Sequence, residues 1–466
     1  MKPITAIVLG AGQRGANVYA AYALNFPNEL KIVGVAEPRA DRRAAFAADH
    51  GIPESHCFES WEGALGCEKF ADCVFVCTQD RMHYEPVLQA LDKGYDVLCE
   101  KPMSYDRAEL IAMGEKARQT GRMLSICHVL RYSPFFVKLK ELIESGAIGQ
   151  LVSIQHIESV GYWHMAHSFV RGNWNRSEDS CPMILAKCCH DTDILTWLIG
   201  SSCKAVSSFG SLAHFNAAHK PSGAPPYCLD GCTHRDDCPY YAPRFYLEHP
   251  RAVSDGFVSV VSLDPSHEAV LNALQRGPYG RCVYQCDNDV VDNQVVNLLY
   301  ENGVSAAMTM CAFTEHCERI INVMGSHGQI QGNMESSTME ISDFATGNRT
   351  TLHVHTPAGG HIHVVDLAKG HVAAIQYLMQ HNGESVFNLG TGHGYSVLDM
   401  VHAFEEANDV VVPYQIAARR QGDLPICYAD TSKSTELLGW RAEKSLIDMC
   451  RDTWNWQKQN PDGYGG

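Results

Sequence analysis

Long apolar runs are absent from this sequence of 466 residues, and no stretch reaches the roughly 18 apolar residues that a membrane-spanning helix needs. The first residues enter an apolar segment with no leader and no small-residue cleavage site, so we expect no signal peptide. Basic charge is also scarce, because 37 Lys and Arg face 53 Asp and Glu, a formal net charge of −16. With no basic stripe to offset this, we expect neither nucleic acid nor a membrane as a partner.

Cysteine, by contrast, is frequent, with 19 residues. In the absence of an export signal we interpret most of them as reduced thiols of a cytoplasmic protein. The composition, 45% apolar and 19% charged, is typical of a globular protein. The length exceeds that of one ordinary hydrophobic core, so we expect about two or three domains.

A glycine-rich turn follows the first apolar segment. Residues 4–10 predict a buried strand, and Gly10-Ala11-Gly12-Gln13-Arg14-Gly15 leads directly into a helical pattern. A GxGxxG turn between strand and helix is typical of dinucleotide binding: its glycines permit a tight turn, a close pyrophosphate and close helix packing. The helix N-terminus adds amide donors for the phosphates.

An acidic residue, Glu37, ends the second predicted strand, residues 31–36. It lies about 20 residues after the glycines, where a partner for the ribose 2′-hydroxyl belongs, and this favours NAD. Arg39, Arg42 and Arg43 follow closely and could meet a 2′-phosphate, so NADP stays open.

Two further predicted strands bring polar residues to the same sheet edge. Residues 71–78 end at Thr78 and are followed by His83, which could line a nicotinamide pocket or cap a helix. Residues 96–99 deliver Glu100-Lys101-Pro102 to the carboxyl edge, where ligands bind in open α/β sheets. A lysine held there can hydrogen-bond a substrate hydroxyl or take part in proton transfer.

Together with the Arg131-Tyr132-Ser133-Pro134 turn, these motifs resemble the glucose-fructose oxidoreductase / myo-inositol dehydrogenase family (Gfo/Idh/MocA) up to about residue 360. The resemblance implies an α/β protein with a Rossmann domain over residues 1–127. It also implies a second α/β domain, over 128–360, with a large, open, mostly antiparallel sheet. Family members oxidise or reduce carbohydrate hydroxyls with NAD(P), and commonly form homo-oligomers through the outer face of that sheet.

His190 opens a predicted helix that Gly200 ends, and it is similar to the catalytic histidine of the family. The resemblance therefore implies that Lys101 and His190 transfer the proton. The aspartate common four residues earlier is replaced by Ala186, and Lys187 could supply a different polar group. Asp193 matches the acidic residue that often follows the histidine.

The expected site residues form two sets. The first would hold the cofactor: Gly10, Gly12, Gln13, Arg14, Gly15, Glu37, Arg39, Thr78, His83, Glu100 and Lys101. The second would hold a carbohydrate: His128, Arg131, Tyr162, His164, His167, Arg171, Lys187 and Asp193. Polar aromatic side chains suit sugar faces and hydroxyls, although the segment 162–174 could equally pack on the domain core. Four more segments predict strands: 281–284, 290–300, 303–310 and 319–330.

A cysteine-rich insertion is expected over about 214–250. Cys228, Cys232 and Cys238 are close enough in sequence to suggest zinc or an iron–sulfur cluster, both of which want four ligands. The fourth could be His234 or a cysteine brought near by folding. Free or packed thiols are the alternative, since the spacing matches no standard zinc finger.

The last segment, residues 361–466, resembles the C-terminal part of UDP-galactose 4-epimerase through 362–371, 387–397 and the Asp452-Thr453-Trp454 end. The resemblance implies that Arg420 and Asp423 help to hold a UDP-sugar and that Cys427 shapes its pocket. No tyrosine in the chain is followed by lysine four residues later, so the epimerase's catalytic pair is missing. We interpret the chain as a fusion whose tail either packs or grips a nucleotide sugar.

The leading hypothesis is an NAD(P)-dependent oxidoreductase acting on a carbohydrate or glycoside hydroxyl. One alternative is an NAD-dependent glycosidase that oxidises C3 transiently and eliminates the aglycone, with His128 or His164 as the extra base. Others are a dehydrogenase of UDP-sugars and a non-catalytic regulator that binds NAD or sugar.

Overall fold

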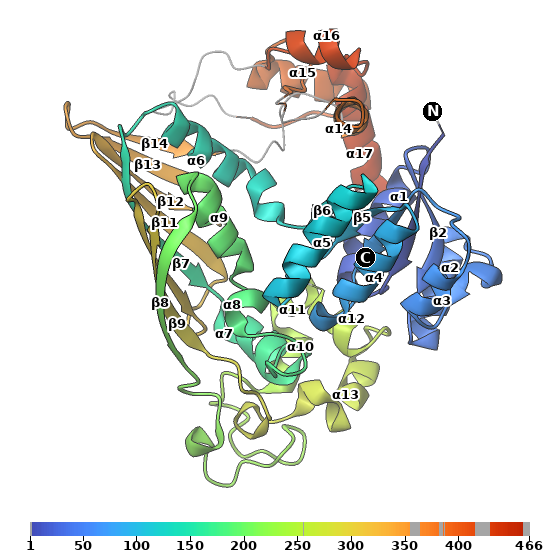
Figure 1. Cartoon of the computed structure of the whole chain (residues 1–466), viewed down its shortest axis with the longest axis vertical. Coiled ribbons are helices and arrows are strands. Elements are labelled where there is room, and N and C mark those ends of the chain that lie inside the picture. The colour runs from blue at the N-terminus through green and yellow to red at the C-terminus, as the bar shows by residue number, and fades with distance from the viewer. Residues whose placement is uncertain are drawn as a thin grey trace. The chain divides into compact units, whose positions relative to one another are not determined.

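The computed structural model describes residues 2–254, 256–354, 364–381, 385, 387–414 and 429–459. The chain divides into two compact units, Met1–Arg349 and Thr350–Gly466. Blue to orange marks the first unit in Figure 1 and orange to red the second. Among the described residues no helix combines the length and the apolar character needed to cross a membrane.

The first sheet is a six-stranded parallel sheet of Rossmann type, as predicted. Its order is β3-β2-β1-β4-β5-β6, and the order reverses between β1 and β4, where dinucleotides bind in such sheets. The strands are β1 (Ile4–Leu9), β2 (Leu30–Ala36), β3 (Cys57–Phe58), β4 (Cys73–Val76), β5 (Asp96–Cys99) and β6 (Leu124–Ile126).

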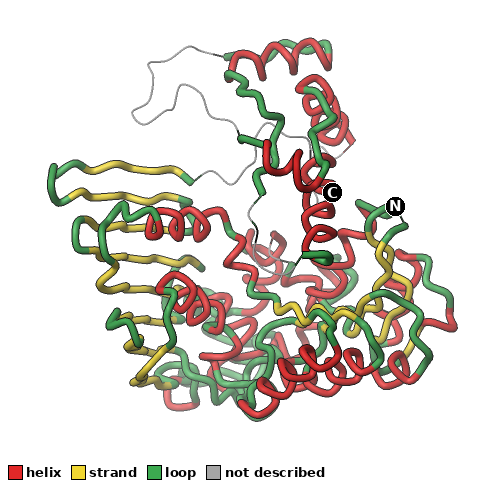
Figure 2. Tube along the Cα trace, turned by 45° about the horizontal axis from the view of Figure 1, so that its top comes forward, coloured by secondary structure: helices red, strands yellow, loops and turns green. Residues whose placement is uncertain are grey.

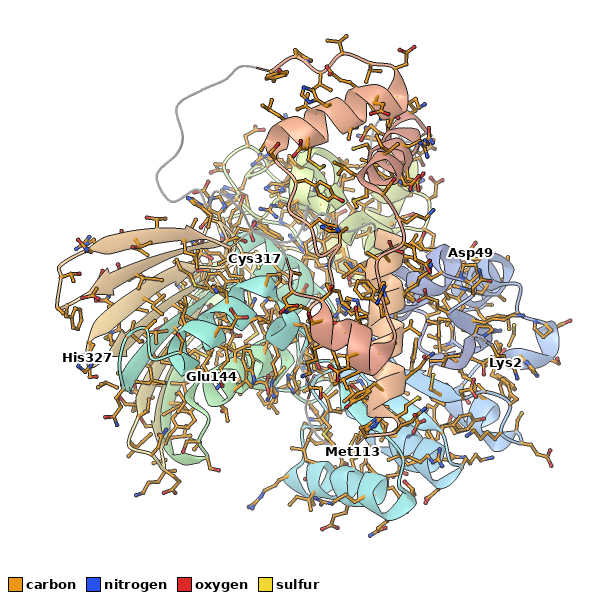
Figure 3. The ribbon with its side chains drawn as sticks, turned by 90° about the horizontal axis from the view of Figure 1, so that it is seen from above. Lys2, Asp49, Met113, Glu144, Cys317 and His327 are labelled. Atoms are coloured by element: carbon orange, nitrogen blue, oxygen red, sulfur yellow. The ribbon has the colours of Figure 1, made fainter. Side chains whose placement is uncertain are left out.

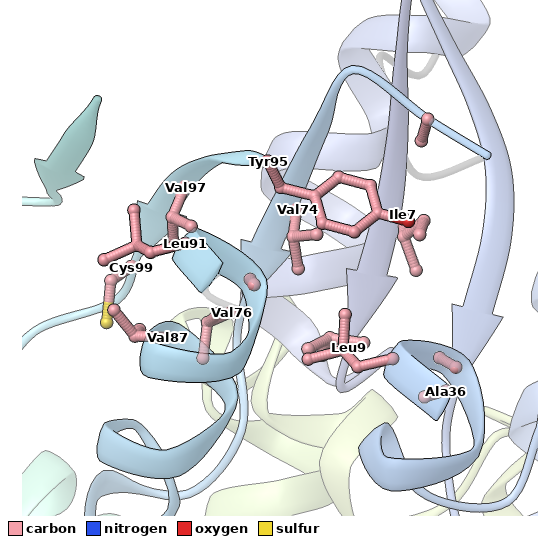
Figure 4. Packing of buried hydrophobic residues seen from close by; sticks show 14 of the residues in the cluster. Ile7, Leu9, Ala36, Val74, Val76, Val87, Leu91, Tyr95, Val97 and Cys99 are labelled. Atoms are coloured by element: carbon pink, nitrogen blue, oxygen red, sulfur yellow. The ribbon is translucent and has the colours of Figure 1, made fainter. Parts of the chain in front are cut away.

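Helices cover both faces of this sheet, and the hydrophobic core lies between the helices and the strands. The helices are α1 (Ala21–Asn25), α2 (Ala40–His50), α3 (Trp61–Gly66), α4 (Tyr84–Asp92) and α5 (Arg107–Thr120). Figure 4 shows Val74 and Val76 of β4 against Leu91 of α4, all three inaccessible to solvent. Because helices pack on both faces, the strands read as continuous apolar runs. This rigid core fixes the carboxyl edge at which the polar residues stand.

The second sheet has eight strands in the order β14-β13-β12-β11-β7-β10-β9-β8, and it lies apart from the Rossmann sheet in Figure 2. Only the pairing of β7 with β10 is parallel among those described, so the predicted large, mostly antiparallel sheet is confirmed. The strands are β7 (Leu151–Ser159), β8 (Cys203–Ser211), β9 (Asn293–Tyr300), β10 (Ser305–Cys311), β11 (Glu318–Gly325), β12 (Gly328–Asn333), β13 (Thr338–Asp343) and β14 (Arg349–His353).

The strand predicted at 281–284 was wrong. Arg281 makes only an isolated bridge to Tyr227, and Val283–Gln285 forms a short helical turn. The segment resembles a strand of the family's sheet, but no neighbouring strand among the described residues continues the pairing. The bridge instead ties this segment to the cysteine-rich insertion.

The eight-stranded sheet has one face covered by helices and one face with exposed apolar side chains. On the inner face lie α6 (Pro134–Glu144) and α9 (Cys189–Ile199), as Figure 1 shows. On the other face the register sets one row of side chains across five strands: Phe209, Val295, Thr309, Ile157 and Ile320. The four apolar members of this row are exposed.

Short helices fill the space below α9. They are α7 (Tyr162–His164), α8 (Met183–Ala186), α10 (Ala242–Glu248), α11 (Pro250–Ser254), α12 (Phe257–Val261) and α13 (His267–Arg276). Trp163, Phe245 and Phe257 form an apolar cluster among them. The segment 162–174 therefore packs in part on a core of its own.

The helices described in the second unit are α14 (Val364–Leu378), α15 (Val397–Asn408), α16 (Ser432–Leu438) and α17 (Leu446–Gln459). Its buried Asp366 carboxylate accepts hydrogen bonds from the backbone N–H of Glu443 and Lys444, at 2.8 and 2.7 Å. The Trp440 indole donates to the Asp366 carbonyl at 3.0 Å. Arg420, Asp423 and Cys427 lie outside the described residues.

Candidate active site

The glycine turn has the shape of a dinucleotide cradle. Gly10 adopts φ +94°, and a Cβ there would lie 2.5 Å from the Cys77 carbonyl oxygen. A Cβ on Gly15 would overlap the Gly10 carbonyl oxygen. At Gly12, by contrast, the nearest atom to such a Cβ is the Arg42 guanidinium, 4.0 Å away, so the backbone is open to a ligand. These residues fit the pyrophosphate of NAD.

Glu37 stands at the end of β2, with its side chain buried. Its carboxylate accepts hydrogen bonds from the backbone N–H of Ala11 at 3.0 Å and of Arg39 at 3.1 Å. Arg39 pairs with Asp41 at 2.7 Å, and Arg43 donates to the Glu37 carbonyl at 2.5 Å. An acidic acceptor thus faces the glycine turn, while two of the three nearby arginines already have partners.

Glu100 connects the helix after the glycine turn, Gln13–Ala20, to the turn that carries Lys101. Its carboxylate accepts hydrogen bonds from Arg14 Nε at 2.7 Å, from the Tyr19 hydroxyl at 2.5 Å and from the Lys101 N–H at 2.9 Å. Burial alone would raise the pKa of Glu100, but the Arg14 charge and the Tyr19 hydroxyl hold this pKa below its usual value. Glu100 therefore orients Lys101.

His83 connects the loops after β4 and β5. It is buried, and its two ring nitrogens lie 2.8 Å from the Pro102 carbonyl and 3.1 Å from the Thr78 carbonyl. The Thr78 hydroxyl donates to the Met82 carbonyl at 3.0 Å. The His83 and Thr78 side chains thus hold the loops at the carboxyl edge of the sheet.

Gln13, in the glycine turn, lies close to the second part of the chain. Its amide is 3.1 Å from where Gly256 would carry a Cβ.

Lys101 contacts α8, beside the second sheet, at Ala186, the residue that replaces the aspartate expected from the family resemblance. Its Nζ donates a hydrogen bond to the Ala186 carbonyl oxygen at 2.8 Å, at the end of α8. His190 follows four residues later, in the first turn of α9. A backbone carbonyl thus anchors the lysine where a carboxylate would be expected, and the ammonium keeps further N–H donors.

His190 and His128 are neighbouring imidazoles beside Lys101. Their rings lie edge to face, with centroids 6.0 Å apart. Burial, and then the charges of Lys101 and Arg319, lower the pKa of His190 to about 2, so the ring is neutral. The Nδ1 atoms of both histidines are buried without a hydrogen-bond partner in the described part of the chain. Such atoms in a native protein call for a ligand or water.

Arg131 and Asp193 form an ion pair next to His128. Arg131 binds the Asp193 carboxylate through two hydrogen bonds, of 2.8 and 2.6 Å. His128 Nδ1 lies 3.9 Å from the same carboxylate. The structure therefore brings together Lys101, His190, His128, Arg131 and Asp193 from both sheets' neighbourhoods.

A buried ion cluster lies behind His190, on the inner face of the second sheet. The carboxylate of Asp191 accepts hydrogen bonds from Arg319 Nε and His156 Nε2, each at 2.7 Å. Arg319 also pairs with Glu158 at 2.9 Å, and Lys187 pairs with Glu158 at 3.2 Å. Against the effect of burial, Arg319 and His156 hold the pKa of Asp191 well below its usual value. Two carboxylates thus face two cations.

Lys187 accordingly points into this cluster, away from Ala186. Its amino group also lies 4.0 Å from the Cys317 sulfur, which Figure 3 labels, and that sulfur lies 3.7 Å from His164 Nδ1. His164 and Tyr162 are half-buried on α7, and Tyr162 packs edge-on against Tyr240.

His167 and Arg171 are placed elsewhere. Both are buried, and His167 stacks between Phe257 and Tyr279, with centroids 4.2 and 4.8 Å apart, while its Nδ1 meets the Tyr246 hydroxyl at 2.7 Å. Burial, and then the Arg171 charge, lower the pKa of His167 to about 3. The structure does not bring these two side chains to Lys101.

The three expected metal ligands, Cys228, Cys232 and Cys238, line one small cavity with Cys282. All four are free thiols. As the side chains stand, no three His, Cys, Asp or Glu groups of the described residues could hold a metal ion.

Several important side chains escaped the sequence reasoning. Arg319, Glu158, His156 and Asp191 belong to the ion cluster together with Lys187, and Tyr19 donates a hydrogen bond to Glu100. One signal was available: His156 and Glu158 are two residues apart in the sequence of β7 and so share one face of that strand, where buried charge needs a partner.

Two family models match most of the chain. One, described as "Oxidoreductase family, NAD-binding Rossmann fold" (GFO_IDH_MocA), matches residues 4–128, and its companion, "Oxidoreductase family, C-terminal alpha/beta domain", matches residues 140–357. Among solved structures, levoglucosan dehydrogenase in complex with NADH and L-sorbose has a TM-score of 0.55 at 17% identity, covering 76% of this chain and 80% of that one. An aldose-aldose oxidoreductase from Caulobacter crescentus has a TM-score of 0.51 at 15% identity, covering 75% of this chain and 83% of that one. At these identities the likeness shows the fold.

Curated relatives match a smaller part. The UDP-glucose 4-epimerase of Mus musculus is 45% identical over 162 residues, which is 32% of this chain and 47% of that protein. The enzyme of Haemophilus influenzae is 52% identical over 118 residues, or 25% of this chain and 35% of that one. The chain thus spans less than half the length of these two relatives.

Proposed function

The chain belongs to the GFO_IDH_MocA oxidoreductase family, and from that premise we propose that it moves a hydride between NAD(P) and a carbohydrate or glycoside hydroxyl. The observation that carries the proposal is the pair of orphaned imidazole nitrogens, His190 Nδ1 and His128 Nδ1, buried beside Lys101. A sugar presents several adjacent hydroxyls that could satisfy such groups together. The two solved proteins of similar fold described above are a levoglucosan dehydrogenase bound to NADH and L-sorbose and an aldose-aldose oxidoreductase.

The proton chemistry rests on Lys101 and His190. Gly10, Gly12 and Gly15 would hold NAD, which when bound would supply the hydride acceptor. Lys101, fixed by the Ala186 carbonyl and by Glu100, donates a hydrogen bond to the reacting oxygen. The neutral His190 has a free lone pair to take the hydroxyl proton. Negative charge growing on the substrate oxygen would offset the Lys101 charge that now depresses the His190 pKa.

NAD is the proposed cofactor, because the Glu37 carboxylate at the end of β2 could accept hydrogen bonds from the ribose hydroxyls and would repel a 2′-phosphate. Arg42 is the residue that favours NADP, since it reaches the glycine turn. Comparing dissociation constants for NADH and NADPH tests this choice. Tighter binding of NADPH would overturn it.

The test of the main proposal follows NADH absorbance across free sugars, glycosides and UDP-sugars. Lys101→Ala and His190→Ala should each lower kcat at least about 100-fold with an accepted sugar. Lys138→Ala, which removes a partly exposed lysine that pairs with Glu141 at 3.0 Å, is the matched control. Turnover within a few-fold of wild type in either site variant would refute the assignment. NAD binding without reduction of any substrate would favour a regulator.

Redox-assisted glycoside cleavage is a second candidate function. His128 favours it, because a second neutral imidazole next to His190 could remove the C2 proton once C3 is oxidised. Release of the aglycone with NAD needed only in catalytic amounts would distinguish it from net oxidation.

We further propose that the chain forms homo-oligomers through the outer face of the second sheet. Phe209 and Val295 begin the exposed apolar row there, and such rows mark interaction surfaces. Phe209→Asp should lower the oligomer mass measured by light scattering. For the C-terminal segment we propose a packing role. A binding measurement with UDP-sugars tests this role, and no binding is the expected result.

A further inference from the structure

Four cysteines surround a cavity that the proposed redox chemistry does not use. The cavity has a volume of about 20 Å³ and is lined by Cys228, Cys232, Cys238 and Cys282. That volume holds one water-sized particle. Sequence spacing supplied three of these cysteines, and the fold supplies the fourth from a segment more than forty positions further along the chain.

Backbone hydrogen bonds hold the two distant segments together. Tyr227 and Arg281 form the isolated bridge, the Cys228 N–H donates to the Gly280 carbonyl at 2.9 Å, and the Cys282 N–H donates to the Pro226 carbonyl at 2.8 Å. The Cys238 N–H donates to the His234 carbonyl at 2.9 Å, which turns the chain back toward the cavity. Backbone hydrogen bonds thus hold three of the four cysteines, Cys228, Cys238 and Cys282, in place.

A buried cation points to negative charge at this cavity. Arg171 lines it, is only 4% exposed, and has Nη2 3.8 Å from the Cys228 sulfur. Its other hydrogen bonds go to the carbonyls of Arg281 and Tyr240, and no carboxylate pairs with it in the described ranges. A buried guanidinium without a counter-charge is costly. Thiolates around the cavity would provide that counter-charge.

We propose that Cys228, Cys232, Cys238 and Cys282 bind a single Zn²⁺ ion as a closed tetrathiolate site. The small cavity fits a single ion, which favours zinc over the larger iron–sulfur cluster. The four thiols lose their protons on binding, and the side chains turn about their Cα–Cβ bonds to reach the metal, since they do not yet surround it in coordinating geometry. His234 is left out, because its Nε2 already meets the Ser222 carbonyl at 3.0 Å. The ion would staple the insertion to the segment around Cys282.

The experiment measures zinc in the purified full chain by mass spectrometry, after dialysis against metal-free buffer. About one zinc per chain is expected, the stoichiometry of a tetrathiolate site. Cys228→Ser and Cys282→Ser should each lower the zinc content at least tenfold. Cys286→Ser is the matched control, because Cys286 lies four residues from Cys282, is part-buried, and does not line the cavity.

A second measurement covers variants that fail to fold. Co²⁺ added to wild-type protein stripped of metal should produce the intense absorption of tetrahedral cobalt thiolate, and excess Zn²⁺ should abolish it. Zinc content that is unchanged in the Cys282 variant overturns the proposal. So does iron with inorganic sulfide, or a disulfide in place of free thiols at these positions.

Discussion

The buried ion cluster behind His190 makes a quantitative prediction about helix α9. Asp191→Asn keeps the shape of the side chain but removes its charge. Asp191 is completely buried and accepts two hydrogen bonds of 2.7 Å from Arg319 and His156. One carboxylate would then face two buried cations. Breaking a buried pair from one side costs about 3–5 kcal/mol. That is a large fraction of a typical free energy of unfolding of about 5–15 kcal/mol.

Asp193→Asn is the matched control on the same helix. Asp193 pairs with Arg131, whose side chain is 41% exposed, so this loss should cost about 0–1 kcal/mol. Urea unfolding followed by tryptophan fluorescence and circular dichroism measures both variants, with the transition of the first unit analysed separately. Equal losses in the two variants would refute the reasoning.

The charge balance allows a sharper test. Lys187→Met removes one of the two cations, so adding it to Asp191→Asn restores equal numbers of opposite charges. The double variant should therefore be more stable than the sum of the two single losses. Simple additivity would show that the four groups do not act as one cluster.

Three other predictions follow from single side chains. Lowering the pH from about 7 to about 5 should lower the free energy of unfolding by about 2 kcal/mol through His167. The reason is that its folded pKa of about 3 lies below the unfolded value of about 6.5, so that the unfolded chain takes up the proton. His167→Gln should flatten this part of the plot of stability against pH. Gly15→Ala should weaken NADH binding at least about tenfold, because the new Cβ meets a backbone oxygen of the glycine turn, whereas Gly114→Ala, with open space around it inside α5, should be neutral or stabilising by about 0.5–1 kcal/mol in urea unfolding. Lys187→Met alone should lower stability and leave KM for the sugar unchanged, since its amino group pairs with Glu158; a raised KM with unchanged stability would contradict this placement.

The Rossmann part could be read from the sequence because its signals are local. A buried strand, a glycine turn and a helix follow one another within the first 25 residues, and Glu37 ends the next strand. Each element carries its own pattern, and parallel strands bring their carboxyl ends to one edge. Lys101 at that edge was therefore predictable without tertiary information.

The second domain's polar groups were harder, because distant segments decide their partners. Nothing local distinguishes Lys187, which turns into the ion cluster, from a lysine that faces a substrate. His167 and Arg171 lie in an aromatic segment that suits a sugar site equally well, yet they pack against residues about 80 or more positions later. Cys282 lies in the segment 281–284, which was wrongly predicted to be a strand.

The anchor of Lys101 has a consequence for how this site can vary. A side-chain acceptor can be lost through a single codon change, but every amino acid brings a backbone carbonyl. As long as α8 keeps its course, any residue at position 186 presents the same oxygen to the lysine. The side chain at this position is then released from holding Lys101 in place. A side chain small enough for this buried position can then change the electrostatics around the lysine while the hydrogen bond to the carbonyl persists, and in this chain that side chain is the methyl group of Ala186.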